Sequence, residues 1–222
     1  MKKNFCMSVA MEYLAQKDKK LGEFIAKKGK LSFAPFGTLF YTLVCSIIDQ
    51  QVATLAADAI KGRVANLFGE ITPENLKNAT IEQLRSCGMS QRKAEYILGI
   101  TELANAGKLD FDELDKLSDA EITKRLLKIR GVGPWTVEML LMFCFCRADV
   151  TSFGDLAIRR GVMNLYNLKE LTEEKFRRLA KRWSPYGTVA SLYLWQAAVD
   201  KELLARKGKK PILRKVTNFT SK

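Results

Sequence analysis

The 222-residue sequence contains no histidine. This absence excludes three classes of catalytic site that depend on imidazole: the Ser-His hydrolases, the His-ligated zinc enzymes and the zinc deaminases that act on extruded bases. If the chain is an enzyme, its chemistry must come from other side chains.

Cysteines are few, and none stands at a metal-ligand spacing. Cys144 and Cys146 are two residues apart, which places them about 200° apart around a helix, so they cannot both face one metal ion. An odd number of cysteines without a secretory leader predicts reduced, mostly buried thiols. All five lie in apolar or amphipathic stretches: Cys6, Cys45, Cys87, Cys144 and Cys146.

Long apolar runs are also missing. No run approaches the roughly 18 residues of a membrane span, and the polar start lacks the apolar region of a signal peptide. No stretch shows the alternation of apolar and polar residues that is typical of a strand. We therefore expect a cytoplasmic, all-α protein.

Positive charge, in contrast, is abundant: 37 Lys and Arg stand against 24 Asp and Glu, a net charge of +13. Residues 1–30 hold eight lysines against three acids, and residues 201–222 hold eight Lys or Arg against one acid, so the two ends carry nearly all of the excess. This distribution predicts a polyanionic partner, bound by the two basic ends rather than by the nearly neutral middle of the chain. For residues 206–210, a solvated charged tail is an equally good explanation.

Helix signals recur along the chain. Apolar residues follow helical spacing after Thr38 and again after Val52, and the first thirty residues predict one or two helices that end at Gly29. We expect about ten helices and no internal repeat. Four further helix starts are marked by capping residues, namely Thr72, Thr80, Ser90 and Thr172.

One stretch carries the most specific pattern. Ser118 and the glutamate three residues later form a capping box, which predicts a helix that ends near Lys128. Gly131-Val132-Gly133 ends it, and Pro134 opens a second, almost wholly apolar helix that continues to Phe145. Two glycines before a helix N-terminus let backbone N–H groups approach a phosphodiester closely. Two core helices joined by a tight turn are the alternative.

A short polar loop then leads to Asp155, directly before an apolar helix. An aspartate in this position is by default an N-cap. However, LLKIRGVGPWTVEML followed about twenty residues later by DVTSFGDLAIRRG resembles the helix-hairpin-helix, Gly/Pro-rich loop and Asp signature of the HhH-GPD DNA glycosylase superfamily. The resemblance is to its alkylated-base branch, the 3-methyladenine-DNA glycosylase II type, and includes both glycines, the Trp-Thr pair and the Asp.

Three more segments extend the resemblance over roughly residues 37–200: SIIDQQVAT, CGMSQRKAE and WSPYGTVASLYLW. It implies two all-α lobes with the active cleft between them, one formed by the middle of the chain and the other by both ends. We accordingly divide the chain into a basic segment that joins the terminal lobe (1–36), a middle helical lobe (37–117), a hairpin and catalytic Asp region (118–200) and a basic tail (201–222).

The resemblance implies a monofunctional DNA glycosylase. Departure of a base leaves positive charge on the deoxyribose, which the carboxylate of Asp155 would stabilise while it orients the attacking water. Members with lyase activity place a lysine just after the hairpin, where this chain has Trp135. We therefore expect hydrolysis that leaves an abasic site and an uncut strand. Asp149, the other carboxylate of the loop, is the second choice.

The resemblance also implies a base pocket formed by Trp135, Trp195 and Met139, the last at a position where the family has an aromatic residue. N-alkylated purines such as 3-methyladenine and 7-methylguanine are cationic, so they suit electron-rich aromatic faces and need no acid to leave. Gly187 stands where the family has arginine, which leaves the substrate range less defined. Trp195 is equally explained as a core residue of an amphipathic helix.

Further residues would hold the DNA. Gln51 is the candidate wedge that fills the gap left by an extruded base, whereas Gln50 or Gln51 as an ordinary helix cap is the alternative. The hairpin contributes two groups of residues. Contacts to the DNA backbone are expected from Gly131, Gly133, Pro134 and Thr136, and carbonyl ligands for a monovalent cation (Na⁺ or K⁺) from around Leu127, Ile129 and Val132.

No cofactor is expected to be required. The iron–sulfur cluster of some relatives uses four cysteines near the C-terminus, and no cysteine follows Cys146 here. We expect a monomer that acts on double-stranded DNA containing a damaged base, in base-excision repair and in association with the nucleoid. Two alternatives stay open: the same reaction on uracil, hypoxanthine or an oxidised purine, and, with less support, a non-catalytic DNA-binding module.

Overall fold

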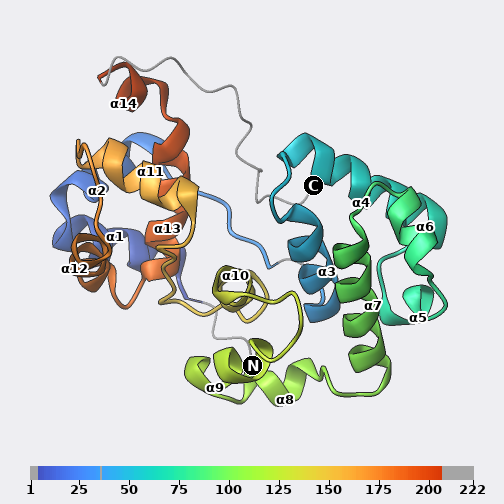
Figure 1. Cartoon of the computed structure of the whole chain (residues 1–222). Coiled ribbons are helices and arrows are strands. Elements are labelled where there is room, and N and C mark those ends of the chain that lie inside the picture. The colour runs from blue at the N-terminus through green and yellow to red at the C-terminus, as the bar shows by residue number, and fades with distance from the viewer. Residues whose placement is uncertain (1–4, 36, 207–222) are drawn as a thin grey trace. The chain divides into compact units, whose positions relative to one another are not determined.

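The computed structural model of the chain describes residues 5–35 and 37–206 (Figure 1). Within these residues it contains fourteen α-helices and no strand, which confirms the all-α prediction. The chain divides into two compact units. The middle unit is Phe36–Leu140, and the terminal unit combines Met1–Pro35 with Leu141–Lys222. One unit is thus continuous in sequence, whereas the other is assembled from both ends of the chain.

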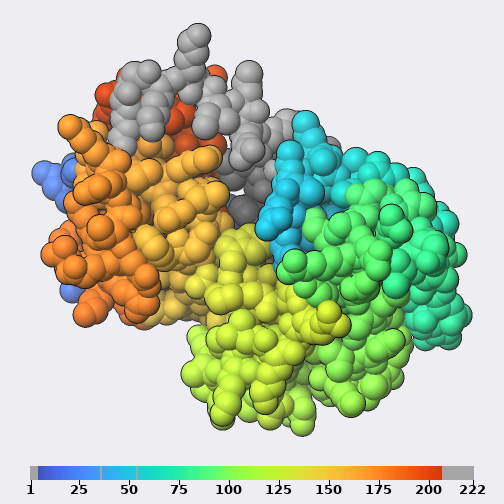
Figure 2. All heavy atoms as spheres, in the orientation of Figure 1, coloured from blue at the N-terminus to red at the C-terminus, as the bar shows by residue number. Residues whose placement is uncertain are grey.

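The middle unit is organised around α7 (Gln91–Asn105), which packs against α3, α5 and α6. Thr72, Thr80, Ser90 and Ser118 each accept a hydrogen bond from an N–H of the first helical turn, so these predicted caps are confirmed. Figure 2 shows α4, in cyan, at the surface of this unit. The other helices are α3 (Leu39–Asp49), α4 (Thr54–Phe68), α5 (Pro73–Leu76), α6 (Ile81–Ser86), α8 (Phe111–Asp115), α9 (Asp119–Leu126) and most of α10 (Pro134–Phe143).

The terminal unit is organised around α13 (Gly187–Val199), a helix with almost every residue buried. It packs against α1, α2, α11, α12 and α14. A helix that is apolar on all sides requires such neighbours, because each exposed face would leave apolar surface in water. The neighbours are α1 (Met7–Lys17), α2 (Lys19–Lys28), α11 (Leu156–Leu165), α12 (Glu173–Trp183) and α14 (Lys201–Ala205).

Helices α11 and α13 approach each other very closely in the terminal unit. A Cβ atom added to Gly161 would lie 1.9 Å from the carbonyl oxygen of Leu194, so only glycine allows the two backbones to touch there. Asp155 stands at the N-terminus of α11, and Trp195 follows Leu194 on α13. This crossing therefore sets the position of one candidate site residue relative to another.

The described residues contain fourteen helices rather than the expected ten, and the short helices α8 and α14 were not predicted. Helices of five residues give no periodic pattern, whereas the equally short α5 and α6 were predicted from their caps. The domain division also differs. The predicted break after residue 117 separates the hairpin from the middle lobe, whereas the structure places α9 and the hairpin in the middle unit. Likewise, residues 201–205 of the predicted tail form α14, in which Leu203 and Leu204 are buried.

Four of the five cysteines are buried, which agrees with the prediction of mostly buried thiols. None of the helices in the described part of the chain is long and apolar enough to span a membrane. The remainder of the predicted basic tail, residues 207–222, lies outside the described residues.

Candidate functional site

Asp155 is the N-cap of α11 and is half-buried. Its Oδ1 atom accepts two hydrogen bonds, one from the backbone N–H of Ile158 (2.7 Å) and one from the indole Nε1–H of Trp195 (3.1 Å). The backbone N–H of Asp155 donates to the hydroxyl of Ser152, a residue with no exposed surface. The carboxylate is therefore fixed by two hydrogen bonds and the backbone of Asp155 by a third, at a helix end that favours negative charge.

Trp195 is 4% exposed and lies within an aromatic stack. Its ring centroid is 5.7 Å from that of Phe143, and Phe143 in turn lies 5.9 Å from Phe33, with nearly parallel planes in both pairs. Trp195 is therefore a core residue, and its buried ring aims the indole N–H at Asp155. Sequence reasoning missed Phe33 and Phe143, since their partners are distant in the chain.

Asp149, the second-choice carboxylate, has a structural role. Its Oδ2 accepts a hydrogen bond from the hydroxyl of Ser184 (2.6 Å), and its Oδ1 accepts one from the backbone N–H of Gly187 at the start of α13 (3.0 Å). A Cβ atom at position 187 would come within 2.8 Å of Asp149 Oδ1 and 2.9 Å of Thr151 Cγ2. This close approach favours glycine at position 187.

The hairpin joins α9 to α10. The Ser118 capping box is complete, and α9 ends at Leu126, two residues before the predicted end. Gly131 has a φ of +89°, and a Cβ atom there would lie 2.4 Å from the ring of Tyr96. This position therefore requires glycine both for its backbone conformation and for the space beside Tyr96. Gly133 faces open space, as nothing lies within 4 Å of a Cβ atom added there. A close backbone approach by another molecule is possible at Gly133.

The second hairpin helix, α10, begins at Pro134 as predicted and ends at Phe143. Pro134 is exposed and Trp135 is half-buried. Thr136 is only 1% exposed, so its side chain is not available to a ligand, although N–H groups of a first helical turn have no partner within the helix. Met139, on the next turn, is 7% exposed.

Two exposed arginines flank the hairpin and were not singled out from the sequence. The guanidinium carbons of Arg92 and Arg130 lie 5.5 and 5.9 Å from the centroid of the Tyr96 ring, and Arg92 Nε donates to the Tyr96 hydroxyl (2.6 Å). Tyr96 therefore packs against Gly131 and holds two cations beside the hairpin. Tyr96 and Arg92 lie on α7, far from the hairpin in sequence, which is why no local motif indicates this cluster.

Gln50 and Gln51 have different environments. Gln50 is the C-cap of α3, and its Nε2 atom donates to the carbonyl oxygen of Gly131 in the hairpin (2.9 Å). Gln51 is exposed and has a φ of +57°, in the left-handed region. The helix-cap alternative thus applies to Gln50, whereas the side chain of Gln51 is at the surface.

The three residues whose carbonyls were expected near a cation lie in the hairpin. Leu127, the C-cap of α9, is 42% exposed, Ile129 is half-buried and Val132 is 7% exposed. The Ile129 carbonyl accepts a hydrogen bond from the N–H of Val132 (3.1 Å), and a carbonyl oxygen retains a second lone pair.

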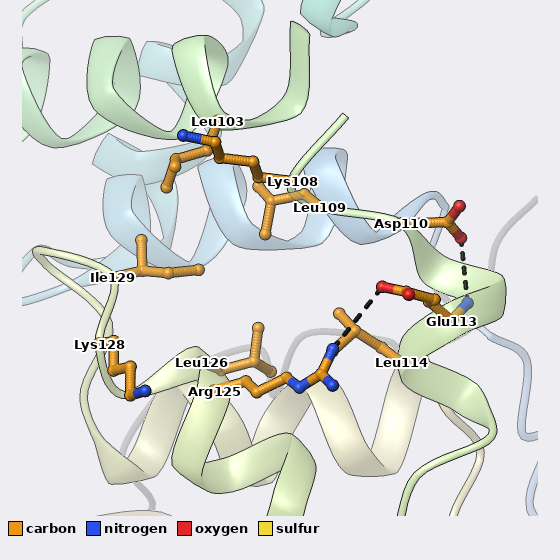
Figure 3. A pocket seen from close by; sticks show the side chains of 10 residues that line it. All are labelled: Leu103, Lys108, Leu109, Asp110, Glu113, Leu114, Arg125, Leu126, Lys128 and Ile129. Carbon is orange, nitrogen blue, oxygen red and sulfur yellow. Dashed lines mark hydrogen bonds and ion pairs between the residues drawn. The ribbon is translucent and has the colours of Figure 1, made fainter. Parts of the chain in front are cut away.

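A surface hollow of about 230 Å³ also lies in the middle unit, between the end of α7, α8 and α9 (Figure 3). An ion pair between Arg125 and Glu113 (3.6 Å) crosses it, and Lys128 stands at its rim. Neither tryptophan of the candidate site lines this hollow. The structure therefore brings together Asp155 and Trp195 in the terminal unit, and the hairpin with Gln50 in the middle unit.

Comparison with known proteins shows which family this chain belongs to. Residues 44–185 match the family model described as HhH-GPD superfamily base excision DNA repair protein. A DNA-3-methyladenine glycosidase structure from Bacillus halodurans has a TM-score of 0.75 and 40% identity over 85% of this chain and 88% of its own. A Schizosaccharomyces pombe 3-methyladenine DNA glycosylase, in complex with abasic DNA, has a TM-score of 0.78 and 31% identity over 84% and 95%. The Bacillus subtilis protein YfjP is 31% identical over 72% of this chain, which spans 59% of YfjP.

Proposed function

This chain belongs to the HhH-GPD superfamily of base excision DNA repair proteins, and we propose that it is a DNA glycosylase that hydrolyses the N-glycosidic bond of alkylated purines. Similarity to two 3-methyladenine glycosylases along most of each chain supports the substrate class. The observation that carries the proposal is the carboxylate of Asp155, fixed at a helix N-terminus by the indole N–H of Trp195.

The proposed chemistry begins with the departing base. As the bond to the sugar breaks, positive charge develops on the deoxyribose, and the Asp155 carboxylate stabilises that charge and orients water. Two hydrogen bonds to Oδ1 hold the carboxylate in place, which limits the reorganisation needed during the reaction. An alkylated purine already carries positive charge and leaves without protonation. The reaction on this substrate therefore needs no histidine to act as a general acid, and this chain has none.

The proposed DNA contacts lie on the hairpin. Open space at Gly133, an exposed Pro134 and the first-turn N–H groups of α10 suit a phosphate of the DNA backbone. Because the Thr136 side chain is buried, its contribution would come from the backbone N–H. Gln51, exposed at the end of α3, would fill the gap that the extruded base leaves.

The proposed base pocket comprises Trp135, Met139 and Trp195. Trp135 is half-buried at the start of α10, which allows its electron-rich face to contact a cationic base. Trp195 is nearly buried and stacked on Phe143, so its main contribution would be to hold Asp155.

The hairpin also fits a monovalent cation. Its proposed ligands, the carbonyl oxygens of Leu127, Ile129 and Val132, are uncharged oxygens near the C-terminal end of α9, where partial negative charge gathers. The Gly131 carbonyl is already engaged by Gln50. Such an ion would stabilise the turn that presents the N–H groups to DNA.

The function is tested by a glycosylase assay on duplexes that each contain one lesion. Release of 3-methyladenine or 7-methylguanine, with little action on uracil, hypoxanthine or 8-oxoguanine, is expected. Release of only uracil, hypoxanthine or 8-oxoguanine would show that the protein is a glycosylase with a different substrate. Binding to damaged duplexes without release of any base would show that the protein is a non-catalytic DNA-binding module.

The enzyme is expected to have no lyase activity. Trp135 occupies the position of the lysine that attacks the sugar in bifunctional relatives, and an indole cannot form an imine. Sodium borohydride should therefore trap no covalent protein–DNA adduct during excision, and strands should break only after alkali or heat. A trapped adduct would contradict this, and Lys128→Met would then show whether Lys128, the nearest lysine in sequence, is responsible.

The C-terminal residues 207–222 are expected to add non-specific DNA affinity without affecting the chemical step. They contain six Lys or Arg and no acid. Each phosphate that the deletion leaves without a cationic partner should flatten the log–log salt dependence of binding by about 0.9. Deletion of 207–222 leaves α14 and its cap Arg206 intact, so single-turnover excision at saturating enzyme should stay near wild type. An unchanged salt slope in the folded deletion variant would show that these residues do not touch DNA.

A further inference from the structure

The loop that carries Gln51 is held by a lysine on another helix. Lys93, in the first turn of α7, donates from Nζ to the carbonyl oxygen of Ile48 (2.8 Å) and to that of Gln50 (2.7 Å). These carbonyls are at the C-terminal end of α3, where the last four have no partner within the helix and carry partial negative charge. An ammonium group is the complementary partner for such a helix end.

The side chain of Lys93 is held in place by its surroundings. Its side chain is half-buried, and burial lowers the pKa of Lys93 from its ordinary value while the nearby Asp49 carboxylate opposes the shift. Asp49 itself forms an ion pair with Lys61 (2.6 Å). A partly buried cation persists only when polar groups compensate its lost hydration, and here the two carbonyls do so.

Gln50 connects Lys93 and the end of α3 to the hairpin. Its carbonyl accepts from Lys93, and its side-chain Nε2 donates to the Gly131 carbonyl (2.9 Å). One turn after Lys93, Tyr96 packs directly against Gly131. Helix α7 therefore contacts the end of α3 through Lys93 and the hairpin through Tyr96, and Gln50 joins the two contacts to each other.

The backbone of Gln51 needs this support. Its φ of +57° is in the left-handed region, which side chains other than glycine adopt rarely and keep only when their surroundings enforce it. Gln51 is exposed, and its turn is closed by the backbone N–H of Val52, which donates to the carbonyl oxygen of Asp49 (3.5 Å). Gln50, the other central residue of this turn, is held by Lys93 and Gly131.

We propose that Lys93 is a positioning residue that acts through Gln50, fixing the Gln51 loop and the Gly131 hairpin as one rigid DNA-binding element. The proposal rests on the proposed glycosylase function. All the groups involved belong to the middle unit. In this arrangement a duplex gripped by the hairpin meets Gln51 at a defined place, so that the wedge enters as the damaged base leaves the stack.

The test compares Lys93→Met with wild type in single-turnover excision of 7-methylguanine from a fully paired duplex. Excision should slow about tenfold, as expected when a reacting assembly is misplaced by a fraction of an ångström. The fluorescence rise of 2-aminopurine placed beside the lesion, which reports unstacking, should slow by the same factor. Lys93→Arg, which keeps the charge and the donors, should restore most of both signals.

A double variant distinguishes positioning from general damage. If Lys93 acts through the Gln51 loop, Lys93→Met combined with Gln51→Ala should be no slower than Gln51→Ala alone, whereas independent effects would multiply. Lys77→Met, which removes one exposed positive charge from the same unit, is the matched control and should excise normally. Gln50→Met, which removes only the donor to Gly131, should resemble Lys93→Met.

The outcomes separate the two proposals. Wild-type rates in a folded Lys93→Met protein, or multiplicative effects with Gln51→Ala, would overturn the positioning role. If Lys93→Met fails to fold, Gln50→Met serves in its place, with the same expectations. Absence of excision by the wild type would overturn the proposed function instead, and the 2-aminopurine signal on a duplex containing 7-methylguanine would still test whether Lys93 positions the loop.

Discussion

Replacement of Asp155 by asparagine is expected to slow excision of 3-methyladenine and 7-methylguanine by about 10²–10³-fold, or roughly 2.7–4 kcal/mol, as for the loss of one preorganised electrostatic group. Asparagine keeps an oxygen that can accept from Ile158 and from Trp195, since both hydrogen bonds go to a single carboxylate oxygen. It is also about as good an N-cap as aspartate. The change thus removes the negative charge and little else.

Three measurements check this expectation: single-turnover excision, binding to a duplex with an abasic-site analogue, and a melting curve. Binding should hold or improve, because the variant no longer repels phosphates, and the melting temperature should change little. Asp149→Asn is the matched control, since Asp149 caps the start of α13 through Ser184 and Gly187. Asp149→Asn should lower the melting temperature, whereas its single-turnover rate of excision should stay near wild type. Near-normal excision by folded Asp155→Asn would remove Asp155 from the mechanism.

The parts of the fold that follow local rules could be predicted from the sequence. Capping residues such as Thr80 and Ser118 act within four residues of themselves, so their patterns indicate helix starts directly. The position of Asp155 as a cap is local in the same sense. The catalytic role proposed for Asp155 rests on resemblance, because a cap and a catalytic carboxylate share the same local sequence.

The contacts that define the site could not be predicted in this way. Trp195 donates to Asp155 across forty positions of sequence, and Gln50 reaches Gly131 across eighty-one. Each pair meets only because helices cross at particular places, and periodicity indicates which face of a helix is buried without indicating its partner. The same reason explains why Lys93, Tyr96 and Phe143 were not assigned roles from the sequence.

The second large effect is expected from Gly161→Ala. In an ordinary helix interior this change stabilises a protein by up to about 1 kcal/mol. Here the added Cβ would lie 1.9 Å from the Leu194 carbonyl oxygen, a backbone atom that no side-chain rotation can move. Overpacking typically costs about 1–3 kcal/mol and occasionally more, and a clash with backbone belongs at the upper end. We therefore expect a net loss of about 2 kcal/mol, or roughly 4–8 °C in melting temperature.

Gly99→Ala and Gly62→Ala are matched controls, because both lie within helices and nothing stands within 4 Å of the added Cβ atom. These two should be neutral or slightly stabilising.

Gly161→Ala should also slow excision at temperatures well below its melting temperature, where the variant is still folded. The strain pushes α11 away from α13 one residue from Trp195, and a shift of even about 1 Å would lengthen its 3.1 Å hydrogen bond to Asp155 beyond bonding distance. A misplacement of that size can cost on the order of 100-fold in rate. A Gly161→Ala protein that melts and excises like the Gly99→Ala control would show that α11 and α13 are not in contact there. The Trp195–Asp155 hydrogen bond would then need another explanation than the crossing of these two helices.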